Sequence, residues 1–174
     1  MSGERIELPD PSELRDDVAA LLPLIAPPGR EPAQTMQILA RQPDLLSPFL
    51  GWAAALALNG TLPKRDHEIL ALRVAYNCAS DYELAEHAEY ARGAGLTEEE
   101  IARIATVDYA WSEDDAVLIR AADELDSLSR LEDATFAALA ARYDDAQLVE
   151  LLFVIGQYTM LSLVANAAGL AVPS

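Results

Sequence analysis

The chain has 174 residues, of which 52% are hydrophobic and 24% charged, a balance typical of a folded globular protein rather than a disordered one. Twelve Lys and Arg residues stand against 29 Asp and Glu residues, and the formal charge of -17 argues against binding to nucleic-acid phosphates or anionic membrane surfaces. The single cysteine, Cys78, excludes an intrachain disulfide. The N-terminus lacks the basic and apolar regions of a secretory signal, so we expect a cytoplasmic protein.

Helix signals separated by proline occupy the first third of the chain. The sequence predicts helices from Pro11 to the Pro27-Pro28-Gly29 break, over Glu31 to Arg41, and over the strongly apolar segment from Pro48 to Leu58. We expect one domain over residues 1–174, in which residues 1–45 form a helical extension to a core of residues 46–174.

The remainder of the chain also has helical patterns throughout. Helices are expected from Pro63 to about Asn77, from about Ser80 to Gly93 or Gly95, after the Thr97–Glu100 capping box, from Ser112 onwards, and over about Asp133–Tyr143 and Asp145–Ala168. No convincing alternating strand pattern and no glycine-rich phosphate loop is present. The sequence therefore predicts an all-α, single-domain helical bundle.

The segment from Leu151 to Val172 contains no charged residue and is long enough to span a membrane. It nevertheless carries polar residues such as Gln157 and Asn166, and no Lys or Arg flanks it closely. We therefore interpret it as a buried core helix, or one shared with a partner subunit, and expect no membrane insertion.

Four polar residues in the middle of the chain form the candidate catalytic group. Ser80, Glu83 and His87 are spaced i, i+3 and i+7, so on a helix they project from one face. Glu68 lies in an otherwise apolar run, where an ionisable side chain is costly to bury without a partner. Convergence of these groups on one apolar pocket would suit acid–base chemistry.

Several candidate residues of this stretch also have a purely structural explanation. Ser80 and Glu83 fit a capping box, in which the Ser80 hydroxyl caps the helix and Glu83 reaches back to the Ser80 amide. Cys78 is either a small buried hydrophobe or a thiol beside a helix start. Arg73 forms an internal ion pair or binds a substrate carboxylate. The aromatic residues Tyr82, Trp111 and Tyr158 belong to the core or line the pocket.

A metal site is disfavoured on residue types. Glu68, Glu83 and His87 are possible ligands, but the chain has only two histidines and no second Glu/His pair. His67 is expected to point elsewhere on the helix that carries Glu68. We therefore predict neither a metal nor another cofactor.

From Leu62-Pro63 to Ile101, and again near Trp111 and from Leu148 to Asn166, the sequence resembles the carboxymuconolactone decarboxylase and alkylhydroperoxidase D superfamily. The peroxidase branch of this family carries Glu-x11-Cys-x-x-Cys-x-x-x-His, whose cysteines cycle through a disulfide. Here Ser80 and Glu83 occupy the two cysteine positions. A hydroxyl and a carboxylate cannot perform thiol–disulfide exchange, so the resemblance favours the branch that lacks the cysteine pair.

The resemblance to the decarboxylase branch implies a cofactor-free lyase or isomerase that acts on a small carboxylated lactone or a related enolisable organic acid. His87 would donate a proton, Glu83 would orient it, and Glu68 would be a second acid–base group. Ser80, Arg73, Tyr82 and Cys78 would contact the substrate. The family also implies an all-helical fold that assembles as a dimer, trimer or hexamer.

Two other functions remain open at this point. One is a peroxiredoxin-like antioxidant protein in which Cys78 acts alone, and the other is a non-catalytic oligomer that binds a small ligand. Cys78→Ser would abolish the activity of the antioxidant protein but not that of the lyase. If the protein only binds a ligand, His87→Ala would leave ligand affinity intact and no substrate would be turned over.

Overall fold

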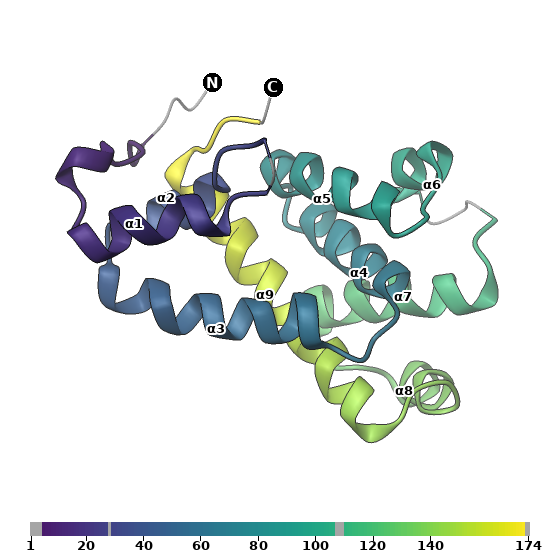
Figure 1. Ribbon diagram of the computed structural model, residues 1–174. Coiled ribbons are helices and arrows are strands. Elements are labelled where there is room, and N and C mark those ends of the chain that lie inside the picture. Colours follow the sequence, from purple (N-terminus) through teal and green to yellow (C-terminus); the bar gives the residue numbers. More distant parts are fainter. Residues whose placement is uncertain (1–4, 28, 107–109, 173–174) are drawn as a thin grey trace. The chain divides into compact units, whose positions relative to one another are not determined.

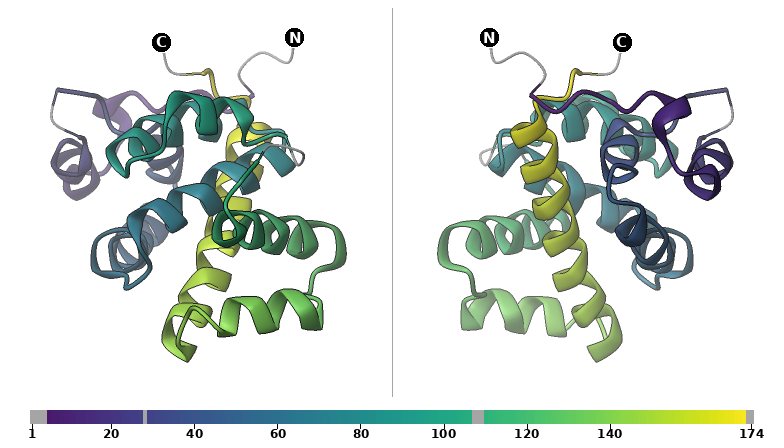
Figure 2. Two further views of the ribbon diagram at one scale, coloured as in Figure 1. Left: turned by 90° about the vertical axis from the view of Figure 1, so that its right-hand side faces the viewer. Right: turned by 90° about the vertical axis from the view of Figure 1, so that its left-hand side faces the viewer.

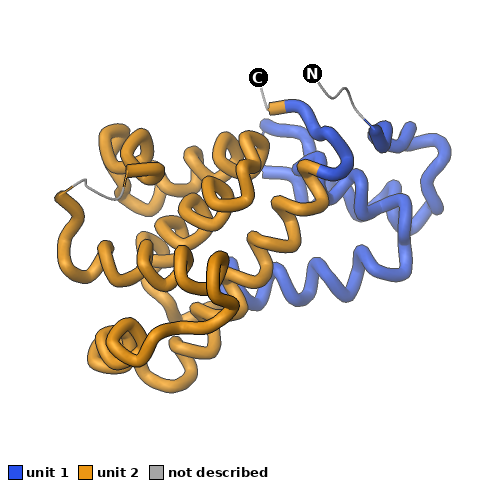
Figure 3. Tube along the Cα trace, turned by 180° about the vertical axis from the view of Figure 1, so that it is seen from behind, with its two compact units in different colours: residues 1–59, 167–171 blue, residues 60–166, 172–174 orange. Residues whose placement is uncertain are grey.

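The computed structural model describes residues 5–27, 29–106 and 110–172, and all regular secondary structure in these ranges is helical (Figure 1). The chain divides into two compact units, Met1–Asn59 with Ala167–Ala171, and Gly60–Asn166 with Val172–Ser174 (Figure 3). The all-α class predicted from the sequence is confirmed. The first unit extends further along the chain than the predicted extension of residues 1–45.

The first unit contains a short 3-10 helix and three α-helices: η1 (Pro11–Glu13), α1 (Asp16–Ile25), α2 (Gln34–Leu39) and α3 (Pro43–Asn59). Its core is formed by the buried residues Val18, Leu22, Ala40 and Leu46. Because Leu46 is fully buried among them, packing holds the first turn of α3. This explains why α3 begins at Pro43, ahead of the predicted Pro48, which lies inside the helix.

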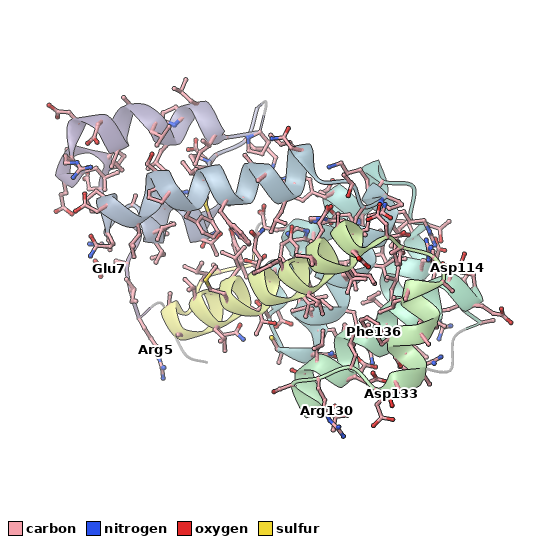
Figure 4. The ribbon with its side chains drawn as sticks, turned by 90° about the horizontal axis from the view of Figure 1, so that it is seen from below. Arg5, Glu7, Asp114, Arg130, Asp133 and Phe136 are labelled. Atoms are coloured by element: carbon pink, nitrogen blue, oxygen red, sulfur yellow. The ribbon has the colours of Figure 1, made fainter. Side chains whose placement is uncertain are left out.

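The segment before η1 is tied to distant parts of the same unit. The backbone amide of Arg5 donates to the carbonyl of Ala168 at 2.7 Å, and the carbonyl of Glu7 accepts from the Arg41 guanidinium at 2.9 Å. Arg5 and Glu7 are labelled in Figure 4. Backbone groups near both chain ends are therefore satisfied within this unit.

The second unit contains six helices in its described residues: α4 (Lys64–Asn77), α5 (Asp81–Gly93), α6 (Glu98–Arg103), α7 (Glu113–Leu128), α8 (Asp133–Ala140) and most of α9 (Asp145–Ala168). Every residue of α4 from Asp66 to Ala75 is buried, as its nearly continuous apolar pattern predicts. Helices α5 and α7 pack against α4, and α8 lies against α7 (Figure 2). The ionisable residues of α4 are thereby placed at the centre of this unit.

The N-terminal end of α4 is fixed by two neighbouring segments. The carboxylate of Asp66 accepts hydrogen bonds from Arg142 and Tyr143, both at 2.6 Å, just before α9 begins. The carboxylate of Glu150 on α9 accepts from the backbone amide of Thr61 at 2.7 Å. Charge-assisted bonds of this kind hold the turn of α4 that carries the next residues, His67 and Glu68.

Helix α9 has 24 residues and is long and apolar enough to cross a membrane by length and composition alone. Of its most apolar 18-residue window, 44% is buried inside the structure. The buried residues include Leu151, Val154 and Tyr158, which follow one another at helical spacing. This face is a core face of the second unit, as the sequence analysis expects.

Candidate active site

Three side chains from two packed helices meet in the second unit. Glu68 lies on α4, and Glu83 and His87 lie one turn apart on α5. Their exposed fractions are 8%, 3% and 8%, so water solvates them poorly and an ionised group among them needs a partner. The structure thus brings together the three residues that the sequence analysis singles out for catalysis.

The imidazole of His87 is held by Glu68. Its Nδ1 lies 2.8 Å from Glu68 Oε2, and because a carboxylate accepts hydrogen bonds, Nδ1 carries the proton and donates. Burial by itself lowers the pKa of His87, but the hydrogen bond to Glu68 and the nearby carboxylate charges outweigh it and raise the pKa above its ordinary value. A second proton is therefore favoured at Nε2, the nitrogen that Glu68 does not engage.

Glu83 faces that second nitrogen at a longer distance. Its Oε2 lies 3.8 Å from His87 Nε2, which is beyond hydrogen-bond length. Its Oε1 is buried and has no hydrogen-bond partner among the residues that the structure describes. Burial, assisted by the charge of Glu86 and opposed by His87, raises the pKa of Glu83. Such a carboxyl group holds its proton closer to neutral pH than an exposed glutamate does.

The turn between α4 and α5 places Ser80 at the start of α5. The Ser80 hydroxyl accepts from the backbone amide of Glu83 at 3.5 Å, while the Ser80 amide donates to the carbonyl of Ala75 at 2.9 Å. Because the Ser80 amide donates to a carbonyl of α4, it is not bonded to the Glu83 carboxylate. Ser80 is an N-cap, but Glu83 does not complete a capping box with it, and its carboxylate is left to face His87.

Two further side chains adjoin this group. The hydroxyl of Tyr158 on α9 lies 2.9 Å from His67 Nε2, and the Tyr158 ring meets the His87 ring edge-on, with centroids 4.4 Å apart. Burial lowers the pKa of His67, so this imidazole is neutral at pH 7. Burial and the charges of Glu68 and Glu83 raise the pKa of Tyr158 well above 10. The neutral His67–Tyr158 pair therefore lies beside the charged His87–Glu68 pair.

His67 and Glu68 bond to different partners, and Tyr158 connects His67 to the His87 ring. From the sequence, His67 had no expected site role, and Tyr158 was expected to belong to the core or to line the pocket. Their positions differ by 91, and no local pattern relates them. The one available signal was polar groups in two otherwise apolar helices, since a buried imidazole or phenol needs a hydrogen-bond partner.

Arg73 is not brought into this group. Its guanidinium donates to both carboxylate oxygens of Asp123, at 2.6 and 2.8 Å, and to the carbonyl of Ile104 at 2.6 Å. These bonds occupy Nε, Nη1 and Nη2. Of the two explanations that the sequence left open, the internal ion pair describes what Arg73 does in this structure.

Cys78 and Tyr82 flank Ser80 in the sequence but differ in environment. Cys78 ends α4 and is half-buried, and burial together with the charge of Asp126 raises the pKa of its thiol. A raised pKa disfavours the thiolate that redox chemistry needs. Tyr82 is 3% exposed, so its ring belongs to the core beside the site.

In the described part of the chain, no group of three or more His, Cys, Asp or Glu side chains is arranged to hold a metal ion. The prediction that the protein uses no metal and no other cofactor stays a prediction. What the arrangement offers chemically is proton transfer among one imidazole and two carboxyl groups.

Residues 43–126 match the model of the carboxymuconolactone decarboxylase family. The structure is also similar to two crystal structures over its full length. One, an uncharacterized peroxidase-related protein from Silicibacter sp. TM1040, is 18% identical with a TM-score of 0.84 and is covered over 94% of its chain. The other is an uncharacterized peroxidase-related protein with an alkylhydroperoxidase AhpD core from Ralstonia eutropha JMP134, 20% identical with a TM-score of 0.78 and also covered over 94%.

A third similar structure is a protein of unknown function from Agrobacterium tumefaciens, which has been connected with the AhpD antioxidant defence proteins. It is 17% identical, has a TM-score of 0.68, and the match covers 78% of this chain and 95% of that one. At these identities the structures show a shared fold. No curated protein matches the chain. The chain is therefore similar to the carboxymuconolactone decarboxylase family over residues 43–126, has an AhpD-like fold, and with its single cysteine has no Cys-x-x-Cys pair.

Proposed function

We propose that the protein is a cofactor-free lyase or isomerase that uses acid–base chemistry on a small carboxylated lactone or a related enolisable organic acid. The observation that carries this proposal is the buried group in which Glu68 holds His87 at 2.8 Å while Glu83 faces Nε2, and Glu83 Oε1 has no hydrogen-bond partner among the described residues. The match of residues 43–126 to the carboxymuconolactone decarboxylase family supports the reaction class.

In the decarboxylation of such a lactone, the bond to the carboxylate carbon breaks and carbon dioxide leaves. The electron pair stays on the substrate as a dienolate, which must then accept a proton at carbon. His87, protonated at Nε2, supplies that proton and stabilises the negative charge before transfer. Glu68 keeps the imidazole oriented throughout, because its bond to Nδ1 does not depend on the substrate.

The two carboxylates exchange the roles that the sequence analysis gave them. Glu68 is the orienting group, at 2.8 Å from the imidazole, and Glu83 at 3.8 Å is the second acid–base group. Glu83 suits this role because burial raises its pKa, so after each turnover the carboxylate can take up a proton from solvent and pass it to the neutral His87.

The test is turnover of a carboxylated muconolactone, followed by release of carbon dioxide and by deuterium uptake from heavy water at the product carbon. We expect His87→Ala to lower kcat by at least about 100-fold and Glu68→Gln by about 10-fold or more, because a positioned proton donor contributes on that scale. Glu89→Gln is the matched control, since Glu89 lies on α5 with an exposed side chain and pairs with Arg92. Full activity of His87→Ala would refute the proposal.

One variant distinguishes the proposed acid–base chemistry from thiol chemistry. The proposal predicts that Cys78→Ser keeps the lyase or isomerase activity, because no second cysteine exists to resolve a disulfide. A thiol-dependent hydroperoxide reduction that disappears in Cys78→Ser would favour the antioxidant alternative instead.

Location and partners complete the proposal. We place the protein in the cytoplasm, with a small organic acid as its ligand and without nucleic acid or membrane as a partner. The formal charge of -17 and the buried face of α9 support this placement. Fractionation of cells that express the full chain tests it, and recovery in the membrane fraction would contradict it.

A further inference from the structure

One buried oxygen in the candidate active site lacks a hydrogen-bond partner among the described residues. Glu83 is 3% exposed, and its Oε1 makes no hydrogen bond there. A buried acceptor left unpaired costs on the order of 1–3 kcal/mol, more if charged, so a ligand that brings a hydrogen-bond donor to the Glu83 carboxyl group would be favoured here. The side chains of His87 and Glu68 beside it retain 10% and 11% exposure, which leaves an approach from solvent.

The charges around this oxygen restrict the ligand. The charges of Glu68, Glu83 and Glu86 all act on His87, whose imidazole is the cationic group at this point. Arg73 contributes nothing here because its guanidinium is bound to Asp123 and Ile104. A ligand carboxylate placed against Glu83 would therefore add to the charges of Glu68, Glu83 and Glu86, with the His87 imidazolium as the cation that faces all of them.

The distance between Glu83 and His87 suits a group that both accepts and donates. His87 Nε2 and Glu83 Oε2 are 3.8 Å apart, so a single oxygen can lie about 2.8 Å from each, off the line that joins them. A hydroxyl oxygen there accepts from the protonated Nε2 and donates its one proton to Glu83 Oε2. A carboxylate oxygen can only accept, so it would bring no donor to either oxygen of Glu83.

We propose that the substrate meets His87 and Glu83 as an uncharged hydroxyl or enol, and that any carboxylate of the substrate lies elsewhere. This inference rests on the proposed function, because it takes these residues as the place where the substrate reacts. It adds the chemical form of the group that they recognise.

The test compares phenol with benzoate as probes of the full-length protein at pH 7. The protein has only two histidines, so the imidazole signals of 15N-histidine-labelled protein report binding at His87, and His67→Gln assigns the two signals. We expect phenol to shift the His87 signal and to bind at least about tenfold more tightly than benzoate, because the hydroxyl pairs with both groups. Phenol binding that is equal to or weaker than that of benzoate, or absent, would overturn the inference.

Glu83→Gln supplies the second arm, with Glu89→Gln as the matched control on the same helix. A carboxamide donates to a carboxylate without repelling it, so phenol should bind about fivefold more weakly and benzoate more tightly in Glu83→Gln alone. Circular dichroism and thermal melting establish that both variants are folded. An unchanged preference in Glu83→Gln would show that Glu83 does not read the hydroxyl, and the inference would fail.

These measurements do not depend on turnover. If the protein prefers phenol but converts no lactone, hydroxyl recognition is supported and the proposed function is contradicted. If the protein converts the lactone but prefers benzoate, the proposed function is supported and hydroxyl recognition is contradicted.

Discussion

The burial of Glu83, which the proposed chemistry uses, lowers the stability of the folded protein at neutral pH. The pKa of Glu83 is raised above the value of 4.5 that an exposed glutamate has, chiefly by burial. A raised pKa means that the folded state binds this proton more tightly than the unfolded state does. Folding stability therefore falls as pH rises above about 4.5, until the folded group has also ionised.

Glu83→Gln should remove that loss. We expect the variant to exceed the parent in free energy of unfolding by on the order of 1 kcal/mol at pH 7 and to match it near pH 3.5, where Glu83 is protonated in both states. Urea denaturation at the two pH values measures this. A variant that is less stable than the parent at pH 7 would contradict the account of Glu83.

At this scale the sequence predicted which three residues meet, but not how they bond. Glu83 and His87 share a helix, so their spacing places them on one face. Which carboxylate binds the imidazole depends on how closely α4 and α5 pack and on side-chain rotamers, which no spacing rule supplies. The contact of Tyr158 with His87 could not be predicted for the same reason, since Tyr158 comes from α9 and meets the site through tertiary packing.

Among the elements, the link between α4 and α5 carries the site. Ala79 there adopts a left-handed conformation with φ of 50°, its amide donates to Tyr76, and the next amide donates to Ala75. This is the usual helix-ending motif in which glycine is favoured, because a Cβ in that conformation costs about 1 kcal/mol.

Ala79→Gly should therefore stabilise the protein. We expect a gain of about 0.5 kcal/mol or more in the free energy of unfolding, since the relief of the left-handed alanine exceeds the added freedom of the unfolded chain. The control is Ala137→Gly on the exposed face of α8, where the same substitution should cost about 1 kcal/mol. Denaturant titration of both variants checks the opposite signs, and a loss in Ala79→Gly would refute the argument.

Helix positions were the most predictable feature of the chain. The capping box predicted at Thr97 and Glu100 is confirmed, and α7 begins after Ser112 as expected. The clearest difference is α3, whose first turn precedes the proline that signalled its start. Proline marks a permitted helix start without requiring one, and the burial of Leu46 decided the boundary.

For the molecule as a whole, the exposed apolar residues of α9 are the feature that bears on assembly. Five of them are 37% to 60% exposed and recur at helical spacing: Val149, Leu152, Met160, Leu163 and Val164. A continuous apolar stripe of this kind is unusual on the surface of a soluble monomer. We propose that a second copy of the chain covers it in a dimer, trimer or hexamer.

Light scattering after gel filtration should thus give a mass that is a multiple of 18.8 kDa at micromolar concentration. Leu152→Glu combined with Leu163→Glu should shift the protein towards monomer, because two charges would be buried unpaired at the contact. Leu128→Glu on α7, at a residue of 45% exposure outside the stripe, is the control and should leave the mass unchanged. A monomeric parent protein would contradict the proposed assembly.

Asp66, His67 and Glu68 are three consecutive residues, and each bonds to a different partner: Arg142 and Tyr143 before α9, Tyr158 within α9, and His87 on α5. One turn of a single helix thus connects the His87 imidazole to segments that lie far from it along the chain. Warming should consequently abolish turnover and melt the second unit over one and the same temperature interval, without an earlier step in which the chemistry alone is lost.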